Sequence, residues 1–565
     1  MGYSEAYCHL CGVSFNISRV RQVREPEIAT YGSSDGMDAA VEDIELEECM
    51  KNGCTLILHF LKEEDDDSVN DPDYEPNEAD YDEKWYHYDS DYESDDDMSI
   101  SSDENGDDQQ DTEHEALYRD FLSKTIRRQP HACGEPVGAY LFSPETKRTD
   151  TLIPITSAKL PEGYDPEDLE HIPGPGCREA LAYPGDSISL AEMRGCRTAQ
   201  FLVHKTCAKG DWKPDGFNED WEMSEDWFLS GVCDGMRSRD CGFPTVWPAR
   251  GGVSDVTSDN VNFFPEQNEP NSIAMPFHPW CFDIFSRQSK VQFGKVNIDG
   301  LMKWRNAESS YEDFHDFPRT GDVLEAQEQW WEHVPGKEYL AANPLYVPGL
   351  PALLQDDTED NTAMDYERPF AASPGTGERV DRLGALPLDL RLHIVSFLDS
   401  TDLTNLRAAS RAFTTLPNGV WYRLVRQDMP WLFEAWVEEI QHTPSFWTTM
   451  TANEIKYVDN VRQRYFNVLQ DEHMAHDGIL DALMARAREG PDQVRLSRAS
   501  TNWHKVYTQI KANWARLKGL HNRQRIWEDV EEIIRRIAKY EAQDTPGGDG
   551  GDQPLLALGS CLGGK

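Results

Sequence analysis

The feature that most restricts the fold of this 565-residue chain is a block of acidic residues in its first quarter. Residues 63–115 contain 25 Asp or Glu and a single Lys, a net charge of −24, which is half of the −48 carried by the whole chain. Like charges at this density repel one another and leave little apolar surface to bury. We therefore predict a disordered acidic tract that separates a short N-terminal segment from the rest of the chain.

The overall charge also restricts the partners. With 102 acidic and 54 basic residues, the chain is poorly suited to bind a phosphate backbone, and an anionic membrane surface would repel it. The N-terminal sequence lacks the pattern of a secretory signal, and "CTLILHFL" at 54–61 is far shorter than a membrane-spanning helix. We expect protein partners, with no nucleic acid and no membrane, and a location inside the cell, in the cytoplasm or nucleus. Twelve cysteines would there be thiols or metal ligands.

The remaining sequence predicts a multi-domain α+β protein. The region 116–350 mixes short apolar runs with many Gly, Pro and Trp, and "AQFLV" at 199–203 is its clearest strand. From 381 the apolar residues follow a helical period, and we expect Gly519 to stop the helix that begins near Trp503. A second helix follows, with Ile526, Val530, Ile533 and Ile537 on one face. The predicted parts are an N-terminal segment (1–62) packed on the middle domain, the acidic tract (63–115), an irregular α+β middle domain (116–350), a linker (351–380), a three-helix unit (381–425), an all-α Trp-rich C-terminal domain (426–543) and a disordered tail (544–565).

The stretch "LPLDLRLHIVSFLDSTDLTNLRAASRAF" at 386–413 predicts two helices joined by a short turn, in which Ser400 or Thr401 caps the second helix. Its first helix has two apolar stripes. One consists of Leu390, Ile394, Phe397 and Leu398, and the other of Leu388, Leu392 and Val395. A unit of about 45 residues cannot bury both stripes by itself. One stripe should form the local core, and the other should contact the rest of the chain or a separate protein. The sequence does not decide which stripe faces outward.

This stretch resembles an F-box. The resemblance rests on Leu386-Pro387, Asp389-Leu390, Ile394, Phe397-Leu398, Asp399, Asp402-Leu403, Leu406, Ser410-Arg411, Phe413 and Trp421. It implies a substrate receptor that docks on the Skp-family adaptor of a cullin–RING ubiquitin ligase and recruits an unidentified protein substrate. The receptor would be non-catalytic, because the reactive cysteine belongs to the ubiquitin-carrying enzyme. The expected adaptor contacts are Leu386, Pro387, Leu390, Ile394, Leu398, Leu403 and Leu406, supported by Trp421.

Three Cys/His pairs are candidate metal ligands. Cys8 and Cys11 have C-x-x-C spacing, which lets two thiolates reach one tetrahedral ion. Two H-x-x-C pairs follow, His204/Cys207 and His278/Cys281. Six ligands are too many for one zinc and too few for two. Because aromatic residues flank "FHPWCF" and would bury its ligands, we predict one structural zinc bound by Cys8, Cys11, His278 and Cys281. In the alternative interpretation, Cys8 and Cys11 are exposed thiols and His278 and Cys281 only pack.

The other cysteines are predicted to be packing residues: Cys196 and Cys207 as small buried side chains, and Cys49 and Cys54 beside "TLILHF". The C-x-x-C and H-x-x-C pairs, with "GPGC", "EMRGCRTAQ", "FHPWCFDIF", "NW…LKG" and "NRQRIW", resemble large F-box proteins of filamentous fungi.

The sequence contains no P-loop, no G-x-S-x-G and no H-E-x-x-H. The alternative to the ubiquitin-ligase role is a metal-stabilised interaction scaffold unconnected to ubiquitin. The two differ in whether an adaptor and a cullin bind the full-length chain.

Overall fold

The structure is a computed structural model of the whole chain. It describes residues 7–25, 29–31, 45–58, 151–160, 162, 169–179, 181–208, 219–234, 274–308, 317–327, 333–354, 370, 381–436, 442, 445, 448 and 494–544. The predicted acidic tract, most of the predicted linker and the tail after Asp544 lie outside these residues. The described part combines helices with small sheets, which confirms the predicted mixture of α and β structure.

The sheet nearest the centre has the strand order β7-β6-β8 and is antiparallel. Its middle strand β6 (Thr198–His204) contains the predicted "AQFLV" strand, and it pairs with β7 (Trp227–Asp234) and β8 (Met275–Phe277). All residues of β6 except His204 are buried. A strand that is covered on both faces has no exposed polar face, which explains the adjacent apolar residues 201–203. The buried amide of Gln200 in the same strand donates to the Ser230 carbonyl at 2.8 Å.

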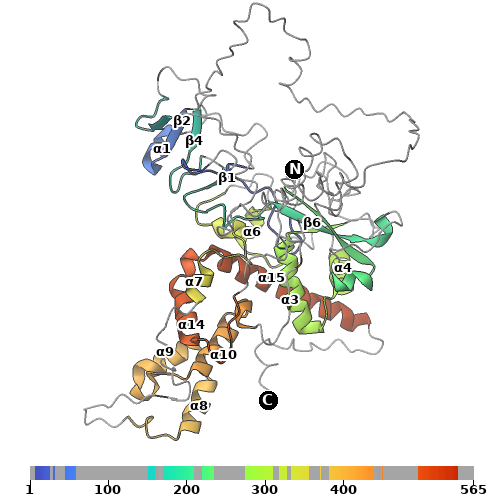
Figure 1. Cartoon of the computed structure of the whole chain (residues 1–565), viewed down its shortest axis with the longest axis vertical. Coiled ribbons are helices and arrows are strands. Elements are labelled where there is room, and N and C mark those ends of the chain that lie inside the picture. Colours follow the sequence, from blue (N-terminus) through green and yellow to red (C-terminus); the bar gives the residue numbers. More distant parts are fainter. Residues whose placement is uncertain are drawn as a thin grey trace, which may run out of the picture.

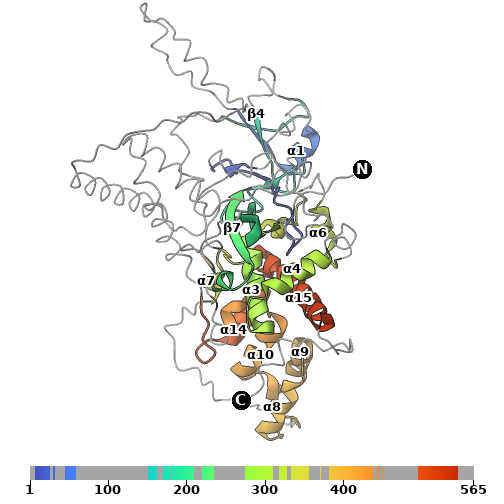
Figure 2. The same ribbon diagram turned by 90° about the vertical axis from the view of Figure 1, so that its right-hand side faces the viewer.

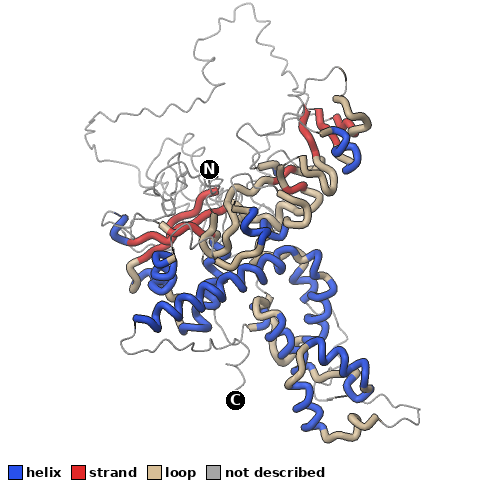
Figure 3. The backbone as a smooth tube through the Cα atoms, turned by 180° about the vertical axis from the view of Figure 1, so that it is seen from behind, coloured by secondary structure: helices blue, strands red, loops and turns tan. Residues whose placement is uncertain are grey.

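Two smaller sheets lie beyond this one. In the antiparallel sheet β3-β2-β4, β2 (Thr55–Leu58) lies between β3 (Thr151–Pro154) and β4 (Leu169–Ile172), and α1 (Leu46–Asn52) precedes it. The two-residue strands β1 (Arg19–Val20) and β5 (Tyr183–Pro184) pair in parallel. In Figure 3 the strands gather at one end of the molecule and most helices at the other.

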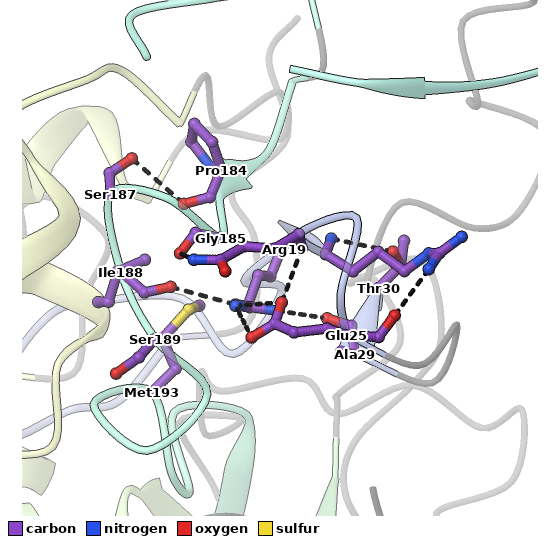
Figure 4. Close-up of polar contacts among 12 residues, drawn as sticks. Arg19, Glu25, Ala29, Thr30, Pro184, Gly185, Ser187, Ile188, Ser189 and Met193 are labelled. Atoms are coloured by element: carbon purple, nitrogen blue, oxygen red, sulfur yellow. Dashed lines mark hydrogen bonds and ion pairs between the residues drawn. The ribbon is translucent and has the colours of Figure 1, made fainter. Parts of the chain in front are cut away.

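Arg19 connects the N-terminal segment to the loop after β5 through hydrogen bonds. Its guanidinium is fully buried and donates hydrogen bonds to the Ile188 carbonyl (3.2 Å), to the Ala29 carbonyl (2.8 Å) and to both carboxylate oxygens of Glu25 (2.8 Å each) (Figure 4). Burying a guanidinium is tolerated only when its donors are satisfied. The segment that follows Cys11 is therefore fixed against residues more than 160 positions away in the chain.

A long C-terminal helix crosses the middle of the molecule. The helix α15 (Lys518–Asp544) packs on α3 (Pro279–Phe293) and α4 (Ile298–Ala307) (Figure 2). The predicted stripe of Ile526, Val530, Ile533 and Ile537 is completely buried. The shorter elements of the described residues are α6 (Gly321–Glu325), α7 (Leu350–Leu354), α14 (Trp503–Ala512), and the 3-10 turns η5 (Lys205–Ala208), η6 (Asp220–Met223), η7 (Glu338–Ala341), η9 (Phe433–Ala435) and η10 (Trp514–Arg516).

The predicted helix stop at Gly519 is wrong. The helix α14 already ends at Ala512, and Gly519 lies in the first turn of α15. A Cβ at Gly519 would be 2.4 Å from the carbonyl oxygen of Asn343. Glycine is therefore required here for a close approach between two segments, which nothing in the local sequence reveals.

The predicted three-helix unit forms an arm at the end opposite β2 and β4 (Figure 1). It consists of α8 (Leu388–Ser396), α9 (Ser400–Ala409), the turn η8 (Arg411–Phe413) and α10 (Asn418–Asp428), and α10 packs on α14. The cap of α9 is Asp399, whose carboxylate accepts from the Asp402 N–H at 2.8 Å. The predicted caps, Ser400 and Thr401, lie inside the helix.

One apolar cluster runs through most of the described residues, from Cys8 to Ile537. It includes the N-terminal segment, α3, α4, the inner side of the arm and α15. The C-terminal helix α15 buries its apolar face against α3 and α4 of the middle region. The predicted domain boundaries stay predictions.

Candidate metal centre

The first two candidate ligands lie on a tight turn at the start of the chain. Tyr7 and Ser14 form an antiparallel bridge that closes this turn. Inside it, the Cys8 N–H donates to the Val13 carbonyl (2.9 Å) and the Gly12 N–H donates to the Cys8 carbonyl (2.7 Å). Gly12 has a φ of +76°, a conformation that glycine adopts without strain. The turn brings the side chains of Cys8 and Cys11 to one side, as C-x-x-C spacing predicts.

The second pair lies where β8 passes into α3. His278 is the N-cap of α3 and Pro279 occupies its first position, where a missing N–H costs nothing. The Cys281 N–H donates to the His278 carbonyl at 2.8 Å, so that one helical turn places both side chains at the helix N-terminus. The positive end of the helix dipole favours a thiolate there.

The structure brings the four predicted ligands together. The ligand atoms of Cys8, Cys11, His278 and Cys281 all lie within 4.8 Å of one another, and each residue is at most 1% exposed. Nδ1 of His278 is 3.6 Å from Sγ of Cys11. Three thiols and one imidazole are a donor set that fits a tetrahedral ion such as Zn²⁺. The alternative of exposed thiols at Cys8 and Cys11 is wrong, because both are buried.

The orientation of the imidazole suits a metal ligand. Nε2 of His278 lies 3.0 Å from the carbonyl oxygen of Cys196, which can only accept a hydrogen bond. The ring proton therefore resides on Nε2, and the lone pair of Nδ1 faces the thiols. Metal-bound histidines characteristically donate their second ring N–H in this way, which fixes the tautomer.

Burial disfavours the charged, thiolate form of these cysteines. It is the largest cause that raises the pKa of Cys8, and it raises the pKa of Cys281 well above its usual value. In Cys11 the same effect is outweighed by hydrogen bonds with Cys281 and Cys8 and by His278, so its pKa falls well below the usual value. A divalent cation at the centre of the cluster would stabilise the thiolates that burial disfavours.

Two arginines, one of them on the C-terminal helix, support the turn. Arg525 on α15 donates to the Cys11 carbonyl at 2.7 Å, and Arg319 donates to the His9 carbonyl at 3.1 Å. Both guanidinium groups bind the carboxylate of Asp529, at 3.1 and 2.9 Å. Sequence reasoning missed this support, because Arg525 lies more than 500 positions from Cys11.

The other candidate ligands lie elsewhere. Nδ1 of His204 contacts the Thr206 hydroxyl at 2.7 Å, and the side chain of Cys207 lies outside the described residues. Cys196 is buried, as predicted, and its sulfur lies 3.7 Å from the Tyr31 hydroxyl.

Cys49 and Cys54 are also buried, as predicted, but they do more than pack. Their sulfur atoms form a second Cys/His cluster with His171 and Cys177. The sequence reasoning singled out neither partner as a ligand, although the H-x5-C spacing of His171 and Cys177 was a visible signal.

The predicted adaptor contacts divide by exposure. Pro387 and Leu390 are exposed, and Leu386, Ile394, Leu398 and Leu406 are half-buried. Leu403 and Trp421 are buried in the main apolar cluster. Of the two stripes on α8, the one with Leu390 contains the more exposed side chains, whereas Val395 of the other is buried.

Comparisons with known proteins leave the family open. No protein-family model matches the chain, and no solved structure matches it. A short stretch is similar to the mitochondrial ATP-dependent RNA helicase mss116 of Aspergillus oryzae, with 43% identity over 79 residues. This stretch is 13% of the present chain and 12% of the helicase, so the likeness shows no family for the chain. Among the described helices, none combines the length and the apolar character needed to cross a membrane.

Proposed function

We propose that the chain is the substrate receptor of a cullin–RING ubiquitin ligase, and that α8 to α10 form an F-box that docks on a Skp-family adaptor. The observation that carries this proposal is the outer face of α8. On this face Leu390 and Phe397 are 50% and 74% exposed, and Leu388 of the other stripe is 37% exposed. They are three of the eight large apolar side chains exposed in the described residues. Such a concentration within ten residues is typical of a protein-binding surface.

The inner side of the same unit holds this face in place. Val395, Leu403 and Phe413 are buried, and Arg423 of α10 donates to the carbonyl of Leu398 at 3.0 Å. Asp381 accepts from the Ser410 hydroxyl (2.7 Å) and from the Ala412 N–H (3.0 Å), which fastens the start of the unit to its second half. A rigid helix that presents its apolar side chains loses little conformational entropy on binding.

We further propose that Cys8, Cys11, His278 and Cys281 bind a structural zinc ion. Three sulfur ligands and one nitrogen ligand complete a tetrahedral shell and leave no position for substrate or water. The ion would hold the start of the chain on α3. The proposed receptor needs no catalytic residue, since it positions a substrate for the ubiquitin-carrying enzyme.

The docking proposal is tested by the binding of purified full-length chain to purified Skp-family adaptor, with and without cullin, measured by calorimetry. Leu390→Ala combined with Phe397→Ala should weaken binding at least ~10-fold, because central apolar anchors dominate interface energies. Leu386→Ala combined with Pro387→Ala should have the same effect. The matched control is Leu152→Ala with Met223→Ala, which removes two exposed side chains (50% and 59% exposed) that lie outside the three-helix unit.

Absence of adaptor binding by the folded wild-type chain would contradict the proposal and favour a scaffold unconnected to ubiquitin. Equal binding by the α8 variants and the control variant would contradict the proposed docking face.

A further inference from the structure

A second Cys/His cluster lies in the small unit at the end of the molecule opposite α8, where Figure 1 shows α1, β2 and β4 together. Cys49 is in α1, Cys54 directly precedes β2, His171 is in β4, and Cys177 follows in the next turn. The four ligand atoms lie within 4.8 Å of one another. Nε2 of His171 is 3.3 Å from Sγ of Cys49 and 4.0 Å from Sγ of Cys177.

The backbone around this cluster is shaped to bring the ligands together. Gly53 ends α1 in the left-handed conformation, with a φ of +72°, and the Cys54 N–H donates back to the Cys49 carbonyl at 3.1 Å. In the facing turn, the Gly174 N–H donates to Sγ of Cys54 at 3.1 Å. A Cβ at Gly174 would lie 2.0 Å from the Asn52 carbonyl oxygen, so only glycine allows this approach.

The apolar core on the side of the sheet that faces this cluster is small, and among the described residues the opposite side buries only Ile57 and Ile172 against Val20 and Ala182. The apolar core on the ligand side consists of seven buried residues and is separate from the main cluster. Three of these seven are the cysteines, and the others are Leu46, Leu56, Leu58 and Leu169. Units with so small a core generally need a disulfide or a metal ion. The sulfur atoms of Cys49 and Cys177 are 4.0 Å apart, about twice the length of a disulfide bond.

We propose that Cys49, Cys54, His171 and Cys177 form a second metal site, which binds a divalent ion of the zinc class in a closed, structural shell. The donor set is again three sulfurs and one nitrogen, with the three cysteines almost completely buried. The ion joins the segment that ends at β2 to the segment that contains β4.

The site lies in a unit whose segments are far apart in the sequence. Leu58, the last residue of β2, pairs with Thr151, the first residue of β3. The acidic block at 63–115 falls between these two residues in the sequence. The second ion would close the unit that contains α1 and β4, at the opposite end of the molecule from the proposed adaptor face (Figure 2).

The test counts metal ions on the reduced, full-length chain. The apo chain is titrated with Co²⁺ and followed by the charge-transfer absorption of thiolate-bound cobalt, and zinc content is measured by native mass spectrometry. We expect saturation at two ions per chain. Cys49→Ser with Cys177→Ser should remove one ion, whereas the control Cys233→Ser, which changes a buried thiol outside both clusters, should keep two.

A third variant separates ligation from packing. Cys177→His replaces one donor by another and should keep two ions, whereas Cys177→Ser should keep one. A single ion on the wild-type chain that the Cys49→Ser/Cys177→Ser variant retains would overturn the proposal, as would two ions on that variant. A mass two hydrogens lower under non-reducing conditions that maps to Cys49 and Cys177 would also overturn it, because a disulfide would then take the place of the ion.

Discussion

At the scale of single residues, the geometry of the candidate metal centre depends on Gly12 as well as on the four proposed ligands. Gly12 combines a positive φ with a crowded position, since a Cβ there would lie 2.6 Å from Cδ and Nε of Arg319. Arg319 cannot move aside freely, because its nearly buried side chain binds Asp529 and the His9 carbonyl. The turn that contains Cys8 and Cys11 therefore needs a glycine at this position for two separate reasons.

Gly12→Ala should lower the free energy of unfolding by about 2–4 kcal/mol, which combines a left-handed backbone cost of about 1 kcal/mol with a steric clash. The matched control is Gly294→Ala, because Gly294 has a φ of +73° with no atom within 4 Å of the added Cβ. It should lose only about 1 kcal/mol. Urea unfolding of the zinc-loaded proteins measures both changes. Equal losses in the two variants would contradict the clash with Arg319.

At the scale of elements, α8 has an inner and an outer side, and the two should respond differently to mutation. Leu403 of α9 belongs to the main apolar cluster and is 2% exposed, whereas Leu390 on the outer side of α8 is half exposed. We therefore expect the inner positions to determine the stability of the arm. The outer positions form the proposed adaptor surface and should affect binding.

Leu403→Ala should destabilise the arm by about 2–5 kcal/mol, because it leaves a cavity in a packed core. Leu390→Ala should change stability by less than about 0.5 kcal/mol. Hydrogen exchange of the α8–α10 amides measures the local stability in both variants. Similar changes in exchange would show that α8 has no free outer face.

Elements with a strong local pattern could be predicted from the sequence. The apolar stripe of α15 follows a helical period, β6 contains a short run of adjacent apolar residues, and C-x-x-C and H-x-x-C spacings each place two ligands locally. What could not be predicted depends on contacts between distant segments. Gly519 looks like a helix stop until the Asn343 carbonyl is placed beside it. Cys49 and Cys54 look like packing residues until β4 brings His171 to them.

At the scale of the whole molecule, the first cluster joins parts of the chain that are far apart in sequence. It unites the turn around Cys8 with the start of α3, and Arg525 connects the same turn to α15. Closing a loop of this length costs more entropy than closing a short one, although the cost rises only with the logarithm of the length. The binding free energy of a structural zinc, about 10–16 kcal/mol in small zinc domains, exceeds that cost. The ion would therefore hold the N-terminal segment in the core that supports the arm.

The most direct test of this account is zinc K-edge X-ray absorption on the full-length chain carrying Cys49→Ser and Cys177→Ser, so that the signal comes from the first cluster alone. The account predicts one bound zinc with three sulfur neighbours at about 2.3 Å and one imidazole nitrogen at about 2.0–2.1 Å. A folded chain that retains no zinc, or a shell made only of nitrogen and oxygen, would contradict it.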